Sequence, residues 1–241
     1  MKSHGTQRGM VCGLCAVTLV LLCEPSRSYA EAIGGPAKVE KGQWVLGLGG
    51  GGLRKRQMKG GADASLYEGA HFRGYGLTER LTLYGDIGAA YITVNDSAVP
   101  STVGRGFGTN LFATGQLKLK LWENIRHGLE WDGSAQYLYA GVPHKRNNNQ
   151  ASWHEERLAT TLAKSLGDFT PYLGVELSAV QFDYKFRSDK FTLDGTYKPK
   201  SVVGPVVGMS WCFGEHKDTV LNIEATYVNG AEVTVGLSKR Y

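Results

Sequence analysis

The chain has 241 residues, of which 27 are lysine or arginine, 22 are aspartate or glutamate and 10% are aromatic. The first 30 residues hold three basic side chains and one acidic one, so the remainder carries 24 basic against 21 acidic residues. That excess is too mild to indicate a nucleic-acid partner. Past residue 30 the sequence has no apolar run of 18 residues, which excludes a helical membrane protein.

The N-terminus has the pattern of an export signal. Lys2 and Arg8 give a charged start, and residues 11–22 (VCGLCAVTLVLL) form an apolar run that is too short to span a bilayer. Small residues at positions 28 and 30 predict cleavage after Ala30. The sequence therefore predicts three segments: a signal peptide over 1–30, a polar lead over 31–42 and a folded domain over 43–241.

Cysteine usage bears on how the chain is exported. A lipoprotein acylated at Cys23 is the alternative to ordinary cleavage, although Leu22 is bulky for the position before such a site. Cleavage after residue 30 removes three of the four cysteines and leaves Cys212 alone. The exported chain then has no internal disulfide, so hydrogen bonding and burial must hold it together.

Ten segments alternate apolar and polar residues with the period of two that is typical of half-buried strands. In chain order they are residues 43–53, 64–75, 81–93, 109–121, 129–141, 153–164, 171–184, 202–213, 221–228 and 231–241. The segment over 153–164 also fits a helix, and Pro205 indicates a bulge or a strand end in the eighth segment. Eight or twelve strands are therefore the alternatives to ten.

The connections between these segments alternate in length. Long polar connections occupy 54–62, 95–105, 143–152 and 187–200, and short ones occupy 76–80, 122–128, 167–168 and 215–219. Asn229-Gly230 joins the last two segments and is the strongest two-residue signal for a hairpin. A soluble β-sandwich, the main alternative, has no reason to keep this rhythm.

The last segment, AEVTVGLSKRY over 231–241, places Val233, Val235, Leu237 and Tyr241 on one face. An apolar-faced strand that ends on an aromatic residue resembles the closing strand of bacterial outer-membrane β-barrel proteins. Residues 75–92 (YGLTERLTLYGDIGAAYI) resemble the strand–short turn–strand element of small members of that superfamily.

This resemblance implies an all-β fold, a closed antiparallel transmembrane up-and-down barrel of about ten strands in the bacterial outer membrane. It implies long outer loops, short periplasmic turns and a periplasmic lead over 31–42. It also implies that the barrel-assembly machinery reads the last strand.

The pleat then fixes which side chains point into the barrel. The predicted lumen residues are Asp86, Gln116, Lys118, Lys120, Glu130, Asp132, Glu176, Glu224, Glu232 and Arg240. A ten-stranded barrel is narrow, so buried charges of both signs would pair in a structural salt-bridge network. The alternative is a small water-filled pore in which Lys118, Lys120, Glu130 and Asp132 set the ion preference.

The first long connection contains clustered cations, Arg54, Lys55, Arg56 and Lys59. They are either ordinary solvated loop residues or contacts for the phosphates of lipopolysaccharide, which basic groups bind electrostatically. Outer-membrane lipid and lipopolysaccharide are the predicted partners; the oligomeric state is open.

The predicted function is a structural or porin-like role in the envelope, which includes passage of small solutes. A surface adhesion or binding protein is one alternative, and an omptin-like protease or a lipid A-modifying hydrolase is another. His127 and His216 fall in short turns, while His144 and His154 flank a long loop beside Glu155, where solvation is expected. No Cys/His spacing fits a metal, and no cofactor is predicted.

Overall fold

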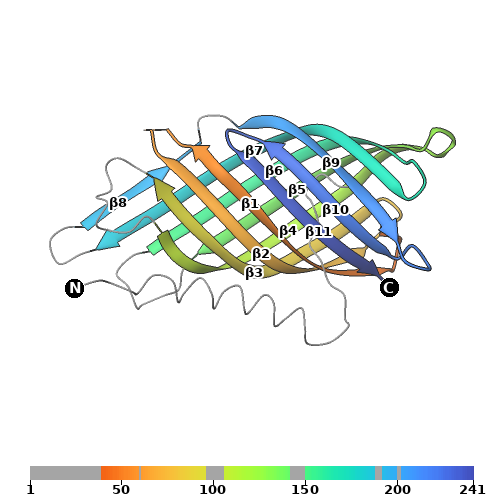
Figure 1. Ribbon diagram of the computed structural model, residues 1–241, viewed down its shortest axis with the longest axis horizontal. Helices are drawn as coiled ribbons and strands as arrows, with labels where there is room; N and C mark the ends of the chain where they lie inside the picture. The colour runs from red at the N-terminus through yellow and green to blue at the C-terminus, as the bar shows by residue number, and fades with distance from the viewer. Residues whose placement is uncertain (1–38, 60, 96–105, 142–149, 188–191, 200–201) are drawn as a thin grey trace, which may run out of the picture.

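The computed structural model describes residues 39–59, 61–95, 106–141, 150–187, 192–199 and 202–241. These residues form β-strands and one short 3-10 turn, Ile125–His127. The strands are β1 (Trp44–Gln57), β2 (Asp63–Gly76), β3 (Leu81–Asn95), β4 (Gly106–Asn124), β5 (Leu129–Gly141), β6 (Gln150–Lys164), β7 (Phe169–Arg187), β8 (Thr192–Tyr197), β9 (Val203–Phe213), β10 (Thr219–Tyr227) and β11 (Ala231–Arg240). Figure 1 shows them tilted across the long axis of the molecule.

Ten of these strands close into a ring. Each strand from β1 to β7 pairs antiparallel with the next, β7 pairs with β9, and β9, β10 and β11 follow in order. The ring closes where β11 pairs with β1, and the backbones of Trp44 and Tyr241 exchange hydrogen bonds of 3.1 and 2.8 Å. The predicted closed antiparallel barrel of ten strands is therefore confirmed.

The segment over 187–200, predicted as the longest loop, contains an additional strand. β8 pairs with the outer part of β7 and lengthens the wall beyond the ring (Figure 1). The helix alternative for 153–164 is wrong, because β6 is hydrogen-bonded to β5 on one side and to β7 on the other. The first strand also continues past its predicted end at Leu53 as far as Gln57.

The outer face of the ring is apolar across its middle. Ile87 is 71% exposed, Leu111 63% and Leu173 66%. Two bands of exposed aromatic side chains border this belt, Tyr67, Tyr91, Tyr137, Tyr139 and Tyr227 toward the long connections and Trp44, Trp122, Trp131, Phe169, Trp211, Phe213 and Tyr241 toward the short ones. An apolar belt between aromatic girdles is the outer surface of a transmembrane barrel. None of the helices among the described residues is long and apolar enough to cross a membrane.

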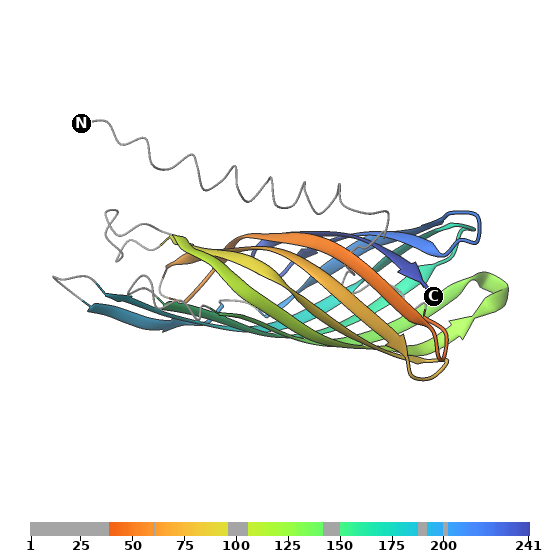
Figure 2. The ribbon, with the colours of Figure 1, turned by 90° about the horizontal axis from the view of Figure 1, so that it is seen from below.

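The interior changes in polarity along the barrel. Toward the long connections a buried apolar core fills it, built from Leu53, Met58, Ala62, Ala64, Leu66, Ala90, Ile92, Val94, Phe112, Leu138, Ala140, Ala151, Trp153, Val180, Phe182 and Tyr184. Toward the short connections, which gather at the end where the C-terminus lies (Figure 2), Val39 packs with Val45, Phe72 and Tyr84. Buried charged side chains lie between these two apolar clusters, and they form the candidate site.

Candidate functional site

An irregularity in β1 decides which way its basic residues point. The register of β1 against β2 shifts between Leu53 and Arg56, and Lys55 within the shift has a φ of 51°. This extra residue makes Arg56, instead of Lys55, the next inward side chain after Leu53. Arg56 is 1% exposed, whereas Lys55 is exposed. The prediction that Arg56 contacts lipopolysaccharide is therefore wrong, because its guanidinium lies inside the barrel.

Strand β6 contributes three inward side chains at alternate positions, Trp153, Glu155 and Arg157, and all three are buried. None of the three is among the predicted lumen residues, and the expectation that Glu155 is solvated is wrong, because its side chain is buried. The sequence does contain a signal for their inward position. If this segment is a strand, the apolar Leu158 and Leu162 mark its outer face. Strict alternation then places Glu155 and Arg157 inside.

The carboxylate of Glu155 accepts four hydrogen bonds. Its Oε1 accepts from Arg56 Nη1 at 2.6 Å and from Ser178 Oγ at 2.6 Å. Its Oε2 accepts from Trp153 Nε1 at 2.9 Å and from Arg157 Nη2 at 3.0 Å. Four donors match the acceptor capacity of an ionised carboxylate, so the burial of this charge is compensated.

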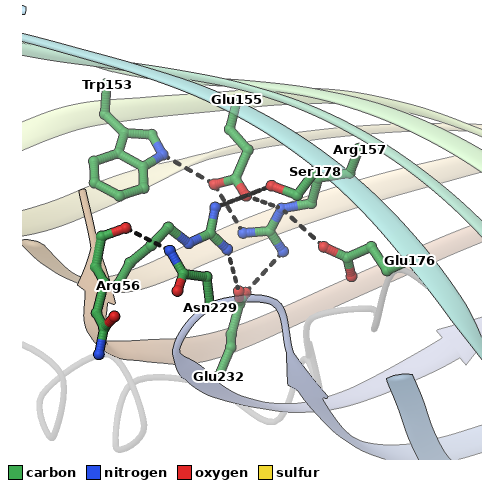
Figure 3. Close-up of polar contacts among 9 residues, drawn as sticks. Arg56, Trp153, Glu155, Arg157, Glu176, Ser178, Asn229 and Glu232 are labelled. Carbon is green, nitrogen blue, oxygen red and sulfur yellow. Dashed lines mark hydrogen bonds and ion pairs between the residues drawn. The ribbon is translucent and has the colours of Figure 1, made fainter. Parts of the chain in front are cut away.

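Glu232 extends these contacts to β11, and Glu176 adds a second side chain from β7. Glu232 Oε1 accepts from Arg157 Nη1 at 2.8 Å, and its Oε2 lies 3.8 Å from Arg56 Nη2. Glu176 Oε1 lies 4.0 Å from Arg157 Nε. We call this set the interior network; it joins β1, β6, β7 and β11 across the lumen (Figure 3) and consists of Arg56, Trp153, Glu155, Arg157, Glu176, Ser178 and Glu232.

More carboxylates lie beside the interior network. Glu68, Asp86 and Glu224 line a cavity of about 40 Å³ that Arg157 and Glu232 also border. That space suits a water molecule but no larger solute. With Glu155 and Glu176 included, two arginines face six carboxylates among the described residues. Each guanidinium is therefore needed to compensate several buried acids.

The predicted lumen residues fall into two groups. Glu176, Glu224, Glu232 and Asp86 lie at the interior network or beside it. The remaining ones lie on β4, β5 and β11, and they are Gln116, Lys118, Lys120, Glu130, Asp132 and Arg240.

In the second group three residues are buried and three border the mouth at the short-connection end. Gln116, Lys118 and Asp132 are buried on the inner face. Lys120, Glu130 and Arg240 border an open hollow of about 370 Å³. Between this mouth and the interior network the lumen therefore holds polar side chains beside the apolar cluster of Val39, Val45, Phe72 and Tyr84.

The other predicted site residues lie on the outside. Lys55 and Lys59 are exposed at the long-connection end, and the side chain of Arg54 lies outside the described residues. In the closing strand Val233, Val235, Leu237 and Tyr241 are on the outer face, where Leu237 is partly buried and the other three are exposed. Their role as an assembly signal stays a prediction.

The histidines lie outside the lumen in the described part of the chain. His71 and His154 are on the outer face, and His154 Nδ1 lies 2.9 Å from the hydroxyl of Tyr137. His127 and His216 occupy short connections, and His144 lies outside the described residues. No three His, Cys, Asp or Glu side chains within the described ranges are arranged to hold a metal ion.

Comparison with known proteins gives a likeness of fold. No protein-family model matches the sequence, and no curated protein matches it. The outer membrane protease OmpT from Escherichia coli is 10% identical with a TM-score of 0.39, over 83% of this chain and 95% of that one. The translocator domain of autotransporter NalP from Neisseria meningitidis is 9% identical with a TM-score of 0.42, over 85% and 90%. Outer membrane protein AlkL is 11% identical with a TM-score of 0.42, over 88% and 96%.

At these identities and scores the likeness transfers no residue role and no activity. The fold of this chain rests on its own closed ring of ten strands, with an apolar outer belt and an interior in which buried charged side chains lie between apolar clusters. That is the architecture of the outer-membrane β-barrels.

Proposed function

We propose that this β-barrel of the outer-membrane type is a structural protein of the bacterial outer membrane, with a lumen that is closed at rest. The observation that carries the proposal is the interior network. Its buried ion pairs join four strands of the wall across the lumen, through Glu155 and Arg157 of β6, Arg56 of β1, Glu176 of β7 and Glu232 of β11. Such contacts stabilise the ring, and they occupy the space that a solute would need.

The assignment to a membrane is supported by the outer surface. The transfer of a large apolar side chain such as Leu111 or Leu173 from water to an apolar environment is favourable by about 1.5–3 kcal/mol of free energy. The belt holds many such side chains, and two aromatic bands border it. The export signal predicted over 1–30 agrees with a location in the outer membrane, and the short connections would then face the periplasm.

The contents of the lumen support a structural role over an open pore. A solute that entered at the short connections would pass the hollow of about 370 Å³ and then meet the interior network, where the adjoining cavity measures about 40 Å³. Beyond it lies the buried apolar core. An ion in that core would lose its water without gaining protein ligands, which is how hydrophobic constrictions close a channel.

Passage of small solutes is the second candidate, and the hollow at the short-connection end favours it. Lys120, Glu130 and Arg240 give this hollow charges of both signs at an open mouth. In this alternative the ion pairs of the interior network would have to separate during transport.

The proposal includes two classes of partner. Lipopolysaccharide would contact the barrel through the exposed Lys55 and Lys59 above the tyrosine band. The barrel-assembly machinery would recognise β11 through Val233, Val235 and Tyr241, which the ring leaves exposed on its outer face.

Gel migration and conductance test the proposal together. We expect the protein from the outer-membrane fraction to migrate differently on a denaturing gel before and after boiling, because a closed hydrogen-bonded barrel resists detergent until it is heated. We expect no steady conductance when the same barrel is placed in a planar bilayer. A soluble periplasmic protein without a gel shift would overturn the membrane assignment. Steady single-channel openings would replace the structural role with a porin-like one.

A further inference from the structure

Beyond the β10–β11 hairpin, at the long-connection end of the barrel, the chain of β1 pairs with a different segment. β11 pairs with β1 only as far as Arg54, and the β10–β11 turn then contacts β1 through a hydrogen bond of 3.0 Å from Gln57 N to Asn229 O. Beyond that point the chain that follows β8 becomes the neighbour of β1. Met58 forms an antiparallel bridge with Pro199, and Lys59 N donates to Lys198 O at 2.8 Å.

This pairing places two lysine side chains opposite each other on the outer surface. Met58 and Pro199 are buried, so their neighbours Lys59 and Lys198 point outward, and both are exposed. Residues directly opposite in an antiparallel pair have Cβ atoms about 5 Å apart, and like charges at that distance are destabilising. Within the described ranges neither ammonium forms an ion pair with a carboxylate. An anion bound between them would remove this repulsion.

The depth of the two lysines fits the polar region of a membrane. Tyr227 belongs to the aromatic band toward the long connections. It pairs with Ala231, as Arg54 does, so the two residues lie at the same position along neighbouring strands. β1 continues to Gln57, which is two strand positions beyond that level once the bulge is allowed for, or about 7 Å, and Lys59 lies two residues further on. On a tilted strand this is the zone of head groups and their sugars, above the apolar belt.

We propose that Lys59 and Lys198 form a phosphate site for lipopolysaccharide, and that the bound phosphate links β1 to the segment after β8. This inference rests on the proposed outer-membrane location. A phosphate group carries about two negative charges and three acceptor oxygens, so it is able to bridge two ammonium groups that a single carboxylate would neutralise only in part. Lys55 lies on the same outer face of β1 and adds to the positive field.

The site differs from the one that the sequence predicted. Arg56 leaves the predicted set, because the bulge turns it inward, and Lys198 enters it from a segment about 140 residues away. Only the pairing of Met58 with Pro199 brings the two lysines together.

Binding of lipopolysaccharide to the purified, folded barrel tests the proposal. The variants are Lys59→Gln, Lys198→Gln and the double variant, with Lys41→Gln as a control at the opposite end of the barrel, where Lys41 is also exposed. Because each ammonium contributes a charged hydrogen bond, we expect each single change at the site to weaken binding at least tenfold, which corresponds to about 1.4 kcal/mol. We expect the control to bind like the wild type. We also expect the wild type to bind dephosphorylated lipopolysaccharide as weakly as the double variant binds intact lipopolysaccharide.

A second measurement separates a phosphate link from general electrostatic attraction. Amide hydrogen exchange at Lys59, whose N–H donates to Lys198 O, should slow when intact lipopolysaccharide is added to the wild type and stay unchanged in Lys198→Gln. Equal binding by wild type and the double variant would overturn the phosphate site. Equal protection by inorganic phosphate alone would assign the site to free phosphate and overturn the lipid. Heat-modifiability of every variant is measured in parallel, so that loss of the barrel itself, which would contradict the proposed function, is recognised separately.

Discussion

Arg157 lies within ion-pair distance of Glu155, Glu232 and Glu176, and it borders the cavity that further acids line. Its side chain is 4% exposed. A buried ion pair contributes little against an apolar replacement of both partners, because desolvation offsets the attraction. Removal of one partner is different, since the other charge then remains buried without compensation. Because carboxylates outnumber arginines in the interior network and beside it, removal of Arg157 leaves more uncompensated charge than removal of one carboxylate.

We predict that Arg157→Met lowers the free energy of unfolding by about 3–5 kcal/mol, because it leaves buried carboxylates without their guanidinium. Urea unfolding of the barrel in lipid vesicles, followed by the gel shift, measures the change. The matched control is Lys217→Gln, which breaks the exposed 2.6 Å pair between Lys217 and Asp168 in two short turns. Exposed pairs of this kind contribute little, so the control should unfold like the wild type. An Arg157→Met barrel as stable as the control would show that the network does not hold the wall together.

At the scale of the element, the bulge in β1 couples the backbone to the interior network. Lys55 sits at a positive φ, and the residues after it face the opposite way from an unbroken strand. The bulge thereby turns Arg56 and Met58 into the barrel and leaves Lys55 and Lys59 outside. One extra residue thus supplies both the interior arginine and the outer lysine of the proposed phosphate site.

Deletion of Lys55 tests this coupling. The register sets Leu53 opposite Leu66 and Arg56 opposite Ala64, so the deletion leaves a regular strand in which Arg56 still points inward and Lys59 outward. We therefore predict a loss of stability well below the roughly 3–5 kcal/mol expected for Arg56→Met. Lys55→Gly is the control, because glycine adopts a positive φ without steric cost and keeps the bulge. We expect its urea midpoint to equal or slightly exceed that of the wild type. A deletion variant as unstable as Arg56→Met would show that alternation from Leu53 does not set the facing of Arg56.

At the scale of the whole molecule, the barrel depends on one closure, the pairing of β11 with β1. Tyr241 takes part through its backbone, which exchanges hydrogen bonds with Trp44, while its side chain is 59% exposed on the outer face. The side chain therefore contributes little to the folded ring itself. An exposed terminal aromatic of this kind is available for recognition before the barrel is complete.

We predict that Tyr241→Ala lowers the amount of heat-modifiable protein in the outer membrane several-fold, while the purified variant refolds in detergent like the wild type, because its backbone pairing is retained. Tyr227→Ala is the control, since that tyrosine is equally exposed but far from the C-terminus. Quantitative gels of the outer-membrane fraction measure the effect. A normal amount of Tyr241→Ala barrel, or a refolding defect in detergent, would contradict a role of this side chain in assembly.

The sequence by itself determined the barrel and most of its surfaces. Alternation has a period of two, and it is a local property, so it located the ten strands of the ring and assigned both the outer apolar face and the inner polar face. Lys118, Asp132, Glu176, Glu224 and Glu232 were placed in the lumen on this ground, and they are buried on the inner face. The hairpin between the last two strands was located correctly, but its connection spans residues 228–230 instead of the predicted two residues, because Tyr227 pairs with Ala231.

Only the tertiary structure decided which of these side chains meet. Arg56 is 99 residues from Glu155 in the chain and contacts it at 2.6 Å, because a bulge reversed its facing and the ring brought β1 opposite β6. Lys198 reaches Lys59 through a backbone pairing beyond the end of β11. Bulges, strand ends and contacts across a lumen depend on the closed wall as a whole, and no local period in a sequence records them.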